Sequence, residues 1–378
     1  MGDYITLFHK FIDFINWEIL QYSTFKLNTD YKVSKFFTKN HLESMIYFHI
    51  AEHKGVRDLR DSVSLSPRLK LLVKSVSLGT LSRHNNNRNY EVFVPVMLEL
   101  ISKAFNSIPT DESLKKFGPI KLIDSTTISM CLTFYQWALF RKKKAGIKIH
   151  TKFDLNKGLP ECFIVTNAKN HDKTKMQELM NEKNCTYIFD KAYVDYKKFD
   201  KFTSQDKYFV TRLKDNAIVN KIKDLKVTYA ETKLLDAKTK IVSDQVVQLG
   251  SESTYKTKKS YRVIKIIDSK NKEIVFVTNI FDLSSEEIAW LYKKRWEIEL
   301  FFKWIKQNLK FKTLIGHSLN AIMIQVITGI MTFVMLKLVE KSASAAFGLI
   351  QIKRKIKYYL NDNINSCSFE WKSWLESG

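Results

Sequence analysis

The run IKLIDSTTI, residues 120–128, is apolar and rich in β-branched side chains, and it carries one acid, Asp124, near its middle. This composition predicts a strand. Two similar runs follow, GIKIHTKFDL (146–155) and CFIVTNAK (162–169), and the Asn-Lys-Gly sequence at 156–158 between them is typical of a hairpin turn. Three strands in series predict an antiparallel meander.

The elements that follow this meander indicate the fold class. Residues 171–181 predict a helix with Asp172 as its N-cap. CTYIFDKAY (185–193) predicts a fourth strand, YKKFDKFTSQ (196–205) a short helix and KYFVTRLK (207–214) a fifth strand. Strand-strand-strand-helix-strand-helix-strand is the order of the ribonuclease H-like fold, so we expect an α/β core of that type.

Beyond residue 215 the pattern changes twice. Alternating stretches such as KIVSDQVVQL (240–249) and KEIVFVTN (272–279), separated by lysine-rich turns, predict a β-rich insertion over 216–280. Helical periodicity returns at Ser284, an N-cap followed by two acids in the first turn. We expect one continuous helix from there through IAWLYKKRWEIELFFKWIKQNL (288–309).

The first ~105 residues show apolar side chains at helical spacing. The polar segment LSRHNNNR (81–88) reads as a turn between helical units, and Arg83 and Arg88 in it suit phosphate or base-edge contacts. A solvated loop with cap residues explains the segment equally well. Near the other end, the apolar stretch 321–336 contains Gln325 and is short for a membrane span, so it predicts a buried helix.

The charge balance of the chain requires an anionic partner. Among its 378 residues, 62 Lys and Arg oppose 39 Asp and Glu, which gives a net charge of +23. Nucleic acid is the first candidate and an anionic membrane surface the second, while a lysine-rich coding bias explains part of the surplus. The four cysteines lack zinc spacing and predict reduced thiols of a cytosolic protein, and the N-terminal residues do not resemble a signal peptide.

Three acids are candidates for metal-assisted phosphoryl transfer, in which two hard divalent cations bind carboxylate oxygens. Asp124 and Asp190 each lie in or after an apolar strand, where a lone carboxylate is costly, and neighbouring strands would bring them together. Glu299 lies in the last predicted helix. Taken singly, Asp124 and Asp190 are weak signals, because a strand-end acid can also cap a turn, and Asp154 fits better as a turn former.

Glu299 belongs to a polar stripe on the predicted helix. Tyr292, Arg295, Glu299 and Lys306 follow one another at spacings of 3, 4 and 7 residues. At ~100° per residue they fall within about 60° of one helix face. The stripe offers a carboxylate for metal and two cations for phosphates. An amphipathic helix with a charged outer face is the alternative.

The combination resembles the Y-R-E-K signature of the insertion-sequence-four family of bacterial DDE transposases, at every position and spacing. Asp124 in IDSTTI and DKAY (190–193) are similar to the first-acid and second-acid motifs of that family. The blocks at 137–160, 37–61 and 81–88 also resemble it, so the similarity covers most of the chain.

The resemblance implies a catalytic triad of Asp124, Asp190 and Glu299 that binds two Mg²⁺ ions, with Mn²⁺ able to substitute. It implies DNA contacts by the side chains of Tyr292, Arg295, Lys306, Tyr193, Arg83 and Arg88. Some family members stack a flipped base on a tryptophan in the last strand of the insertion. Here Phe276 is the only aromatic residue of that strand.

We therefore expect a DDE transposase that binds terminal inverted repeats of double-stranded DNA and performs cut-and-paste transposition. The expected parts are a helical DNA-binding domain (1–110), a core in two pieces (111–215 and 281–340), the insertion (216–280) and a helical tail (341–378). A homodimer in the synaptic complex, a cytoplasmic, nucleoid-associated location and no membrane association complete the expectation. The rivals are a catalytically inactive DNA-binding descendant and a ribonuclease H-like nuclease without transposition.

Overall fold

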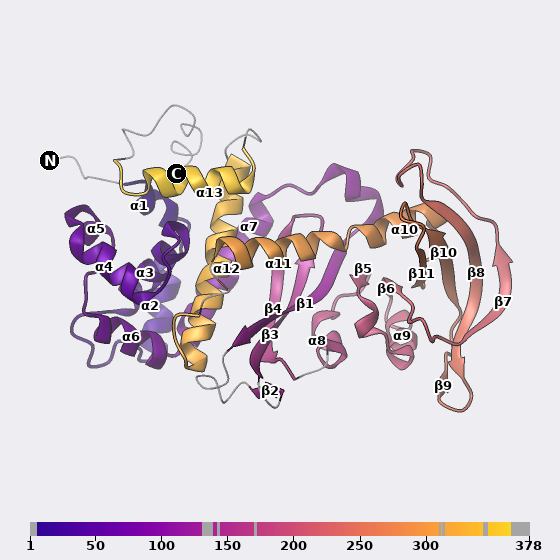
Figure 1. Cartoon of the computed structure of the whole chain (residues 1–378), viewed down its shortest axis with the longest axis horizontal. Helices are drawn as coiled ribbons and strands as arrows, with labels where there is room; N and C mark the ends of the chain where they lie inside the picture. Colours follow the sequence, from indigo (N-terminus) through magenta and orange to yellow (C-terminus); the bar gives the residue numbers. More distant parts are fainter. Residues whose placement is uncertain are drawn as a thin grey trace. The chain divides into compact units, whose positions relative to one another are not determined.

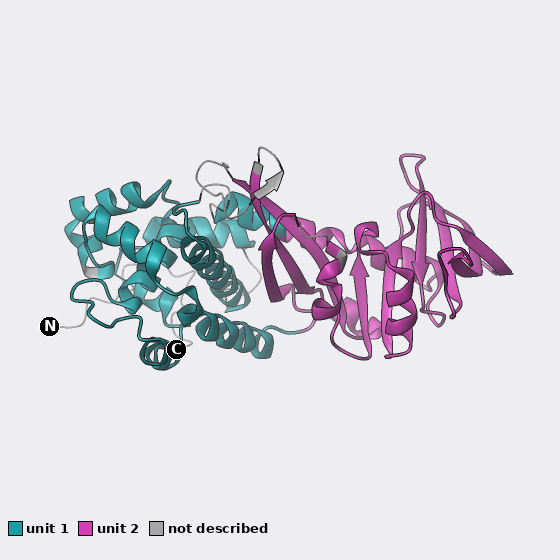
Figure 2. Cartoon of the chain, turned by 90° about the horizontal axis from the view of Figure 1, so that it is seen from below, with its two compact units in different colours: residues 1–109, 133–135, 302–378 teal, residues 110–132, 136–301 magenta. Residues whose placement is uncertain are grey.

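The computed structural model describes residues 6–130, 139–141, 144–169, 172–309, 311, 314–342 and 347–363. The chain divides into two compact units, which Figure 2 draws in different colours. Unit 1 comprises residues 1–109, 133–135 and 302–378, and unit 2 comprises residues 110–132 and 136–301.

Unit 1 is helical, as its apolar spacing predicts. Its N-terminal part contains α1 (Leu7–Ile12), α2 (Trp17–Lys26), α3 (Thr38–Ala51), α4 (Val56–Leu65), α5 (Pro67–Leu72), α6 (Leu78–Asn87), the 3₁₀ turn η1 (Tyr90–Phe93) and α7 (Val94–Ser107). Its C-terminal part contains the end of α11 (Trp296–Asn308), then α12 (Leu319–Ser342) and α13 (Leu349–Tyr359).

Helix α12 is the central element of unit 1, in contact with α3, α6 and α7. It is long and apolar enough to cross a membrane, but 89% of its most apolar window is buried inside the protein. The prediction of a buried helix at 321–336 is therefore confirmed. These contacts also explain why residues 302–340 group with the N-terminal helices, whereas the sequence pattern had grouped residues up to 340 with the core.

Three local predictions were wrong. The segment 81–88 is not a turn, because it belongs to α6, whose first turn is capped by the Ser77 hydroxyl. The helix predicted over 288–309 is two helices, α10 (Ser285–Lys293) and α11, separated by a tight turn in which the Arg295 N–H donates to the Tyr292 carbonyl. The helix predicted over 171–181 is reduced to η4 (Asp172–Thr174) and α8 (Met176–Leu179), and residues 170–171 lie outside the described residues.

Unit 2 is built on one large sheet, so the predicted mixed α/β class is confirmed (Figure 1). In its first half, β4 (Leu159–Asn167), β3 (Lys144–Asp154) and β1 (Ile120–Met130) pair antiparallel, and β2 (Leu139–Arg141) also pairs with β3. Strand β5 (Cys185–Phe189) pairs parallel with β1, and β6 (Lys207–Arg212) pairs parallel with β5. The order across this half is thus β4-β3-β1-β5-β6.

The insertion extends this sheet. Strand β11 (Glu273–Thr278) pairs antiparallel with β6, so that the order continues β6-β11-β10-β8-β7. The remaining strands are β7 (Val219–Leu225), β8 (Lys240–Ser251), β9 (Tyr255–Lys256) and β10 (Tyr261–Ile267). The β-rich content matches the prediction. The pairing of the insertion with the core sheet could not be predicted from the local sequence pattern.

A buried aromatic cluster ties the two halves of the sheet together. Phe199 of α9 (Tyr196–Thr203) stacks on Phe209 of β6 at 4.3 Å between ring centroids, and Phe209 packs against Tyr261 of β10 at 5.8 Å. All three side chains are excluded from solvent. Burial of such rings stabilises the fold by roughly 1.5–3 kcal/mol each, so insertion and core share one hydrophobic core.

Candidate active site

Asp124 and Asp190 are brought together by the parallel pairing of β1 and β5. Ile123 lies opposite Phe189 in this ladder; Asp124 is the next residue of β1, and Asp190 directly follows the end of β5. Successive side chains of a strand point to opposite faces, so the Asp124 carboxylate lies on the face opposite to Ile123. The charge of Asp190 contributes to the raised pKa of Asp124, so the two carboxylates lie near each other.

Glu299 reaches the same face through the turn between α10 and α11. The Arg295 Nη1 lies 3.4 Å from the Asp124 Oδ2, and the Arg295 Nη2 donates to the Glu299 Oε1. Further along α11, Phe301 packs on Phe153 of β3 with ring centroids 5.3 Å apart, which holds the start of the helix against the sheet. One guanidinium thus links two of the three acids.

Burial and neighbouring charges shift the pKa of the Asp124 carboxyl. Burial raises the pKa of its carboxyl to about 6, the Asp190 and Glu299 charges add to this rise, and the Ser125 N–H and Arg295 oppose it. Nearby acids that lie out of water resist simultaneous ionisation. A site of this kind favours any cation that can neutralise the carboxylates.

Tyr292 packs against Arg295 and Phe276. Its ring centroid lies 5.0 Å from that of Phe276 on β11, and the Arg295 guanidinium lies 5.6 Å from the Tyr292 ring centroid. Its hydroxyl is buried, with no hydrogen-bond partner among the described residues. Burial raises the pKa of this phenol, so it stays protonated and able to donate. Phe276 is itself buried, so this ring does not offer an exposed face for stacking a base.

The start of α10 is fixed by a buried carboxylate. Glu286, only 3% exposed, accepts hydrogen bonds from the backbone N–H groups of Ala230, Leu234 and Leu235 in the loop after β7. Carboxylates that accept several N–H bonds near a helix N-terminus are strongly stabilised. This arrangement anchors the helix that leads into Tyr292 and Arg295.

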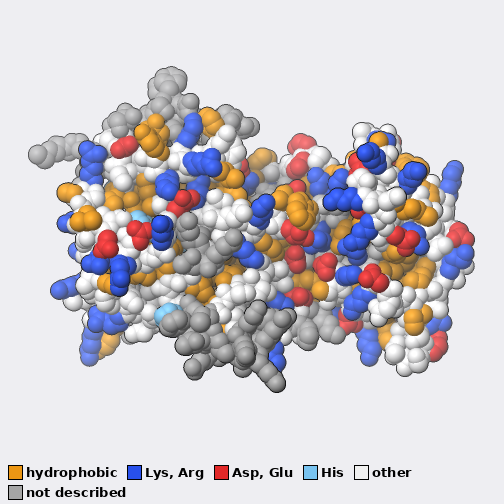
Figure 3. Space-filling model, in the orientation of Figure 1, with side chains coloured by type: hydrophobic (Ala, Val, Ile, Leu, Met, Phe, Trp, Pro, Cys, Tyr) orange, Lys and Arg blue, Asp and Glu red, His pale blue; other side chains and the backbone are white. Residues whose placement is uncertain are grey.

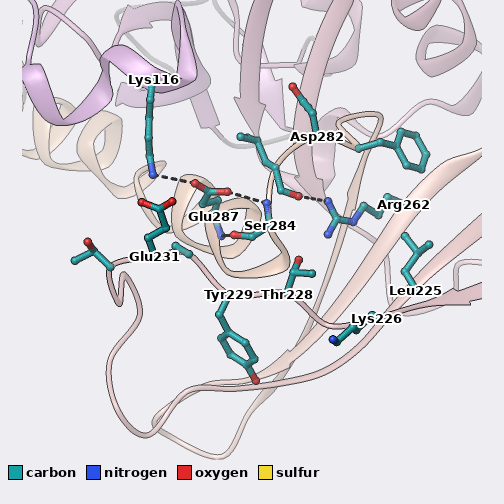
Figure 4. Close-up of a pocket in the computed structure, with 14 residues that line it drawn as sticks. Lys116, Leu225, Lys226, Thr228, Tyr229, Glu231, Arg262, Asp282, Ser284 and Glu287 are labelled. Atoms are coloured by element: carbon teal, nitrogen blue, oxygen red, sulfur yellow. Dashed lines mark hydrogen bonds and ion pairs between the residues drawn. The ribbon is translucent and has the colours of Figure 1, made fainter.

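A cavity of about 710 Å³ lies beside this anchor (Figure 4). Lys116 pairs with Glu287 across its wall, Glu287 closes a capping box with Ser284, and Arg262 donates to the Leu283 carbonyl. Arg262 also forms a buried pair with Asp244. These groups bond to one another, so we assign them to holding α10 in place.

Two of the predicted DNA contacts are not available as such. Arg88 is buried, and its guanidinium donates to the Phe36 and Phe37 carbonyls and to Asp30. Tyr193, in η5 (Lys191–Tyr193), is 1% exposed; its ring packs in the hydrophobic core of unit 2, and Asp172, Asp124 and Asp190 add to the burial that raises the pKa of its phenol. Arg88 therefore supports structure, whereas the buried Tyr193 phenol lies near the acids. Arg83 is exposed on α6, and Lys306 is half-buried on α11 in unit 1.

One charged residue beside Ser125 and Lys148 was not predicted from the sequence. Asp172 accepts a hydrogen bond of 2.6 Å from the Ser125 hydroxyl and lies 3.1 Å from the Lys148 ammonium. It was interpreted only as a helix cap. Ser125 on β1 and Lys148 on β3 lie on paired strands. Their positions along the two strands could have indicated that their side chains share a face.

The three acids have the donor chemistry for a hard divalent cation, because Mg²⁺ prefers carboxylate oxygens. Within the described residues, no group of three or more His, Cys, Asp or Glu side chains is placed so that it could hold a metal ion. The Arg295 guanidinium lies against two of the acids and carries the positive charge there. A bound cation would stabilise the ionised form of Asp124, whose pKa burial raises, so the three acids have the chemistry of metal ligands but are not arranged as a metal site in the described residues.

Cationic side chains are spread over both units on the face drawn in Figure 3, in keeping with the net charge of +23. Such a surface attracts polyanions at long range.

Comparison with known proteins identifies the family. A model described as a transposase DDE domain matches residues 115–335, and a domain of unknown function (DUF4372) matches residues 4–71. The chain is 30% identical over 259 residues to a probable transposase for insertion sequence element IS5377 of Geobacillus stearothermophilus, a match that covers 68% of this chain and 66% of that protein.

Two other relatives are similar. A putative transposase, y4zB, of Sinorhizobium fredii is 30% identical over 59% of this chain and 61% of its own length. A putative transposase for insertion sequence element IS4SA of Synechocystis is 26% identical over 80% of this chain and 83% of its own length. The matched part thus spans under two thirds of the first two relatives.

A piggyBac transposase synaptic complex with hairpin DNA aligns with 99% of this chain and 84% of its own, at a TM-score of 0.45 and 10% identity, a likeness too distant to carry an argument. The family model covers more than half of the chain and includes all three acids. The chain belongs to the DDE-domain transposase family.

Proposed function

We propose that this protein is a metal-dependent DNA transposase of the insertion-sequence-four type, with a ribonuclease H-like core. The order β4-β3-β1-β5-β6, with two antiparallel and two parallel pairings, supports the assignment of the core. The single observation that carries the function is the register of β1 and β5, which aligns Asp124 with Asp190 on the face that Arg295 and Glu299 approach.

In this proposal Asp124, Asp190 and Glu299 hold two divalent cations, Mg²⁺ in the cell and Mn²⁺ as a substitute. When bound, these ions stabilise charge on the attacking and leaving oxygens of the phosphodiester. The nucleophile is water for cleavage and a DNA 3′-hydroxyl for strand transfer. The triad carboxylates supply negative charge only, so cationic and donor groups must come from elsewhere on the chain.

Arg295 is the group that supplies positive charge at the site. Its planar guanidinium can turn from the carboxylates to a phosphate and bind it with two parallel hydrogen bonds. The Tyr292 hydroxyl, protonated and without a partner among the described residues, can donate to the same backbone. Together with Lys306 these side chains are the proposed Y-R-E-K signature, and they orient the scissile strand.

The substrate of the proposed enzyme is double-stranded DNA, both the terminal inverted repeats of the element and the target. Joining two ends in one complex implies a homodimer in the synaptic state. A cytoplasmic protein associated with the nucleoid follows from this substrate and from the positive charge.

The test uses a labelled duplex that carries the DNA flanking the coding sequence, together with a supercoiled plasmid as target. The transposase proposal expects cleavage at the element end in Mg²⁺, none in EDTA, and joining of the cut end to the plasmid. Cleavage without joining would favour a nuclease, and binding without cleavage in any divalent metal would favour an inactive DNA-binding descendant.

A further inference from the structure

One short segment of unit 1 exposes an unusual number of large aromatic side chains. In the second half of α2 and the loop that leads to α3, Tyr22, Phe25, Tyr31 and Phe37 are 67%, 83%, 68% and 43% exposed. Single exposed apolar side chains are normal on a protein surface, but several together mark a binding surface. Three exposed lysines, Lys26, Lys32 and Lys35, alternate with these rings. We name these seven residues the aromatic–lysine surface.

The rings are displayed on an ordered backbone. Tyr22 and Phe25 lie three residues apart on α2 and therefore share a helix face. In the loop that follows, the Asp30 Oδ1 accepts hydrogen bonds of 2.8 Å from both the backbone N–H and the hydroxyl of Thr38. The Thr29 and Thr38 hydroxyls are 2.8 Å apart. The loop is thus closed onto the first turn of α3.

A buried arginine completes this closure. Arg88 donates to the Phe36 carbonyl at 2.8 Å and to the Phe37 carbonyl at 3.2 Å, and it pairs with Asp30 at 3.3 Å. The Arg88 side chain is 1% exposed and that of Asp30 is 24% exposed, so the three bonds from one buried guanidinium fix the geometry of the loop. The segment therefore combines a rigid support with solvent-exposed rings, the arrangement of a preorganised binding site.

The charge of the surface indicates the partner. Within the part of the chain that the structure describes, Lys26, Lys32 and Lys35 take part in no ion pair, and Lys32 lies 5.1 Å from the Tyr31 ring centroid. In a two-fold dimer this surface would face its own copy, so lysines would oppose lysines. A polyanion with flat apolar faces matches both the lysines and the exposed rings of the surface.

We propose that the aromatic–lysine surface binds DNA, with the lysines at phosphates and the rings against base faces that are opened or distorted. Aromatic stacking on bases combined with lysines along the backbone is a general mode of nucleic-acid binding. This inference rests on the proposed function, since it assigns to part of the matched domain of unknown function a contact with the transposase's own DNA.

The test measures the Kd of the full-length protein for the labelled element-end duplex, by fluorescence anisotropy in EDTA so that cleavage does not interfere. Phe25→Ala/Tyr31→Ala should weaken binding about tenfold or more, with an unchanged melting temperature because both rings are exposed. Tyr358→Ala is the matched control, since this α13 ring is 79% exposed, and it should bind like the wild type.

The lysines are tested through the salt dependence. Lys32→Ala/Lys35→Ala should reduce the slope of log K against log salt by about 2, roughly 0.9 for each phosphate that the variant no longer neutralises. Lys70→Ala/Lys74→Ala removes the same charge from another exposed part of unit 1 and should change the slope less.

The failures can be told apart. If the wild type binds and cuts the duplex but the surface variants bind like their controls, the inference is overturned and the proposed function stands. If the wild type binds no DNA, both are overturned. If the surface variants keep their DNA affinity and instead lose self-association in sedimentation, the surface is a contact between copies.

Discussion

Asp124 on β1 and Arg295 in the turn between α10 and α11 lie 3.4 Å apart, from Oδ2 to Nη1, although 171 residues separate them in the chain. The same guanidinium binds Glu299, four residues further along. Because the turn interrupts the helix at this point, Arg295 can contact the strand acid and the helix acid together. Arg295 thus links two of the three acids. Its positive charge balances the carboxylates and can also bind a DNA phosphate.

Replacement of Arg295 should therefore impair catalysis more than folding. We expect Arg295→Gln to lower the cleavage rate constant by roughly 10²–10³-fold, the usual loss for a group that stabilises transition-state charge. Arg295→Lys should recover only part of the rate, because an ammonium cannot form two parallel bonds. Lys293→Gln, an exposed change in the same helix region, is the control. Cutting by Arg295→Gln at the wild-type rate would remove this role.

The elevated pKa of Asp124 predicts a pH dependence of stability. Its value in the folded chain is about 6, against 3.8 when unperturbed. The folded state therefore holds this proton more tightly, and the resulting stability is complete below about pH 4 and is lost as the pH rises through about 6. In EDTA, the free energy of unfolding should fall by on the order of 2–3 kcal/mol over that window.

Urea unfolding at several pH values measures this effect, with Asp124→Asn as the comparison. The variant cannot ionise at this position, so its stability should fall less between pH 4 and 6. Parallel curves for the two proteins would contradict the assignment of the raised pKa to Asp124.

Glu286 should be important for stability without touching the substrate. Glu286→Ala removes the acceptor of three backbone N–H groups in the 230–235 segment and leaves them without this partner. We expect a loss of roughly 2–4 kcal/mol in the free energy of unfolding. Glu231→Ala, at an exposed position of the same loop, should change stability by less than about 0.5 kcal/mol. Equal effects of the two changes would mean that Glu286 does not anchor α10.

The two arginines of the 81–88 segment should behave oppositely. Arg88→Ala leaves Asp30 and two carbonyls without their buried donor and should destabilise the protein by roughly 3–5 kcal/mol. Arg83→Ala, on the exposed face of α6, should leave the melting temperature unchanged and act only on DNA affinity. Thermal unfolding of both variants decides this, and a stable Arg88→Ala protein would contradict the structural role.

A local sequence pattern predicts helices and strands, but it contains no information on contacts between distant parts of the chain. The convergence of Asp124 and Asp190 was expected because the first and fourth strands are neighbours in a ribonuclease H-like sheet, while their register is a long-range property that the sequence pattern does not contain. The break at Arg295 was missed because the spacing of Tyr292, Arg295 and Glu299 is compatible with one helix or with two.

Long-range partners explain the other errors. The role of Arg88 depends on Asp30 and on carbonyls some fifty residues earlier in the chain, which no local window contains. The burial of Tyr193 depends on the core between α8, α9 and the sheet. Likewise, the pairing of β11 with β6 follows from the shared aromatic core and not from composition.

The measurement that tests the central claim most directly is cleavage of the labelled element-end duplex in Mg²⁺ by the wild type, Glu299→Gln and Glu297→Gln. Glu297 is an exposed acid two residues away on the same helix, so its change removes the same charge outside the proposed site. We predict that the wild type and Glu297→Gln cut while Glu299→Gln binds the duplex without cutting it. Cutting by Glu299→Gln at the wild-type rate would contradict the assignment of the triad.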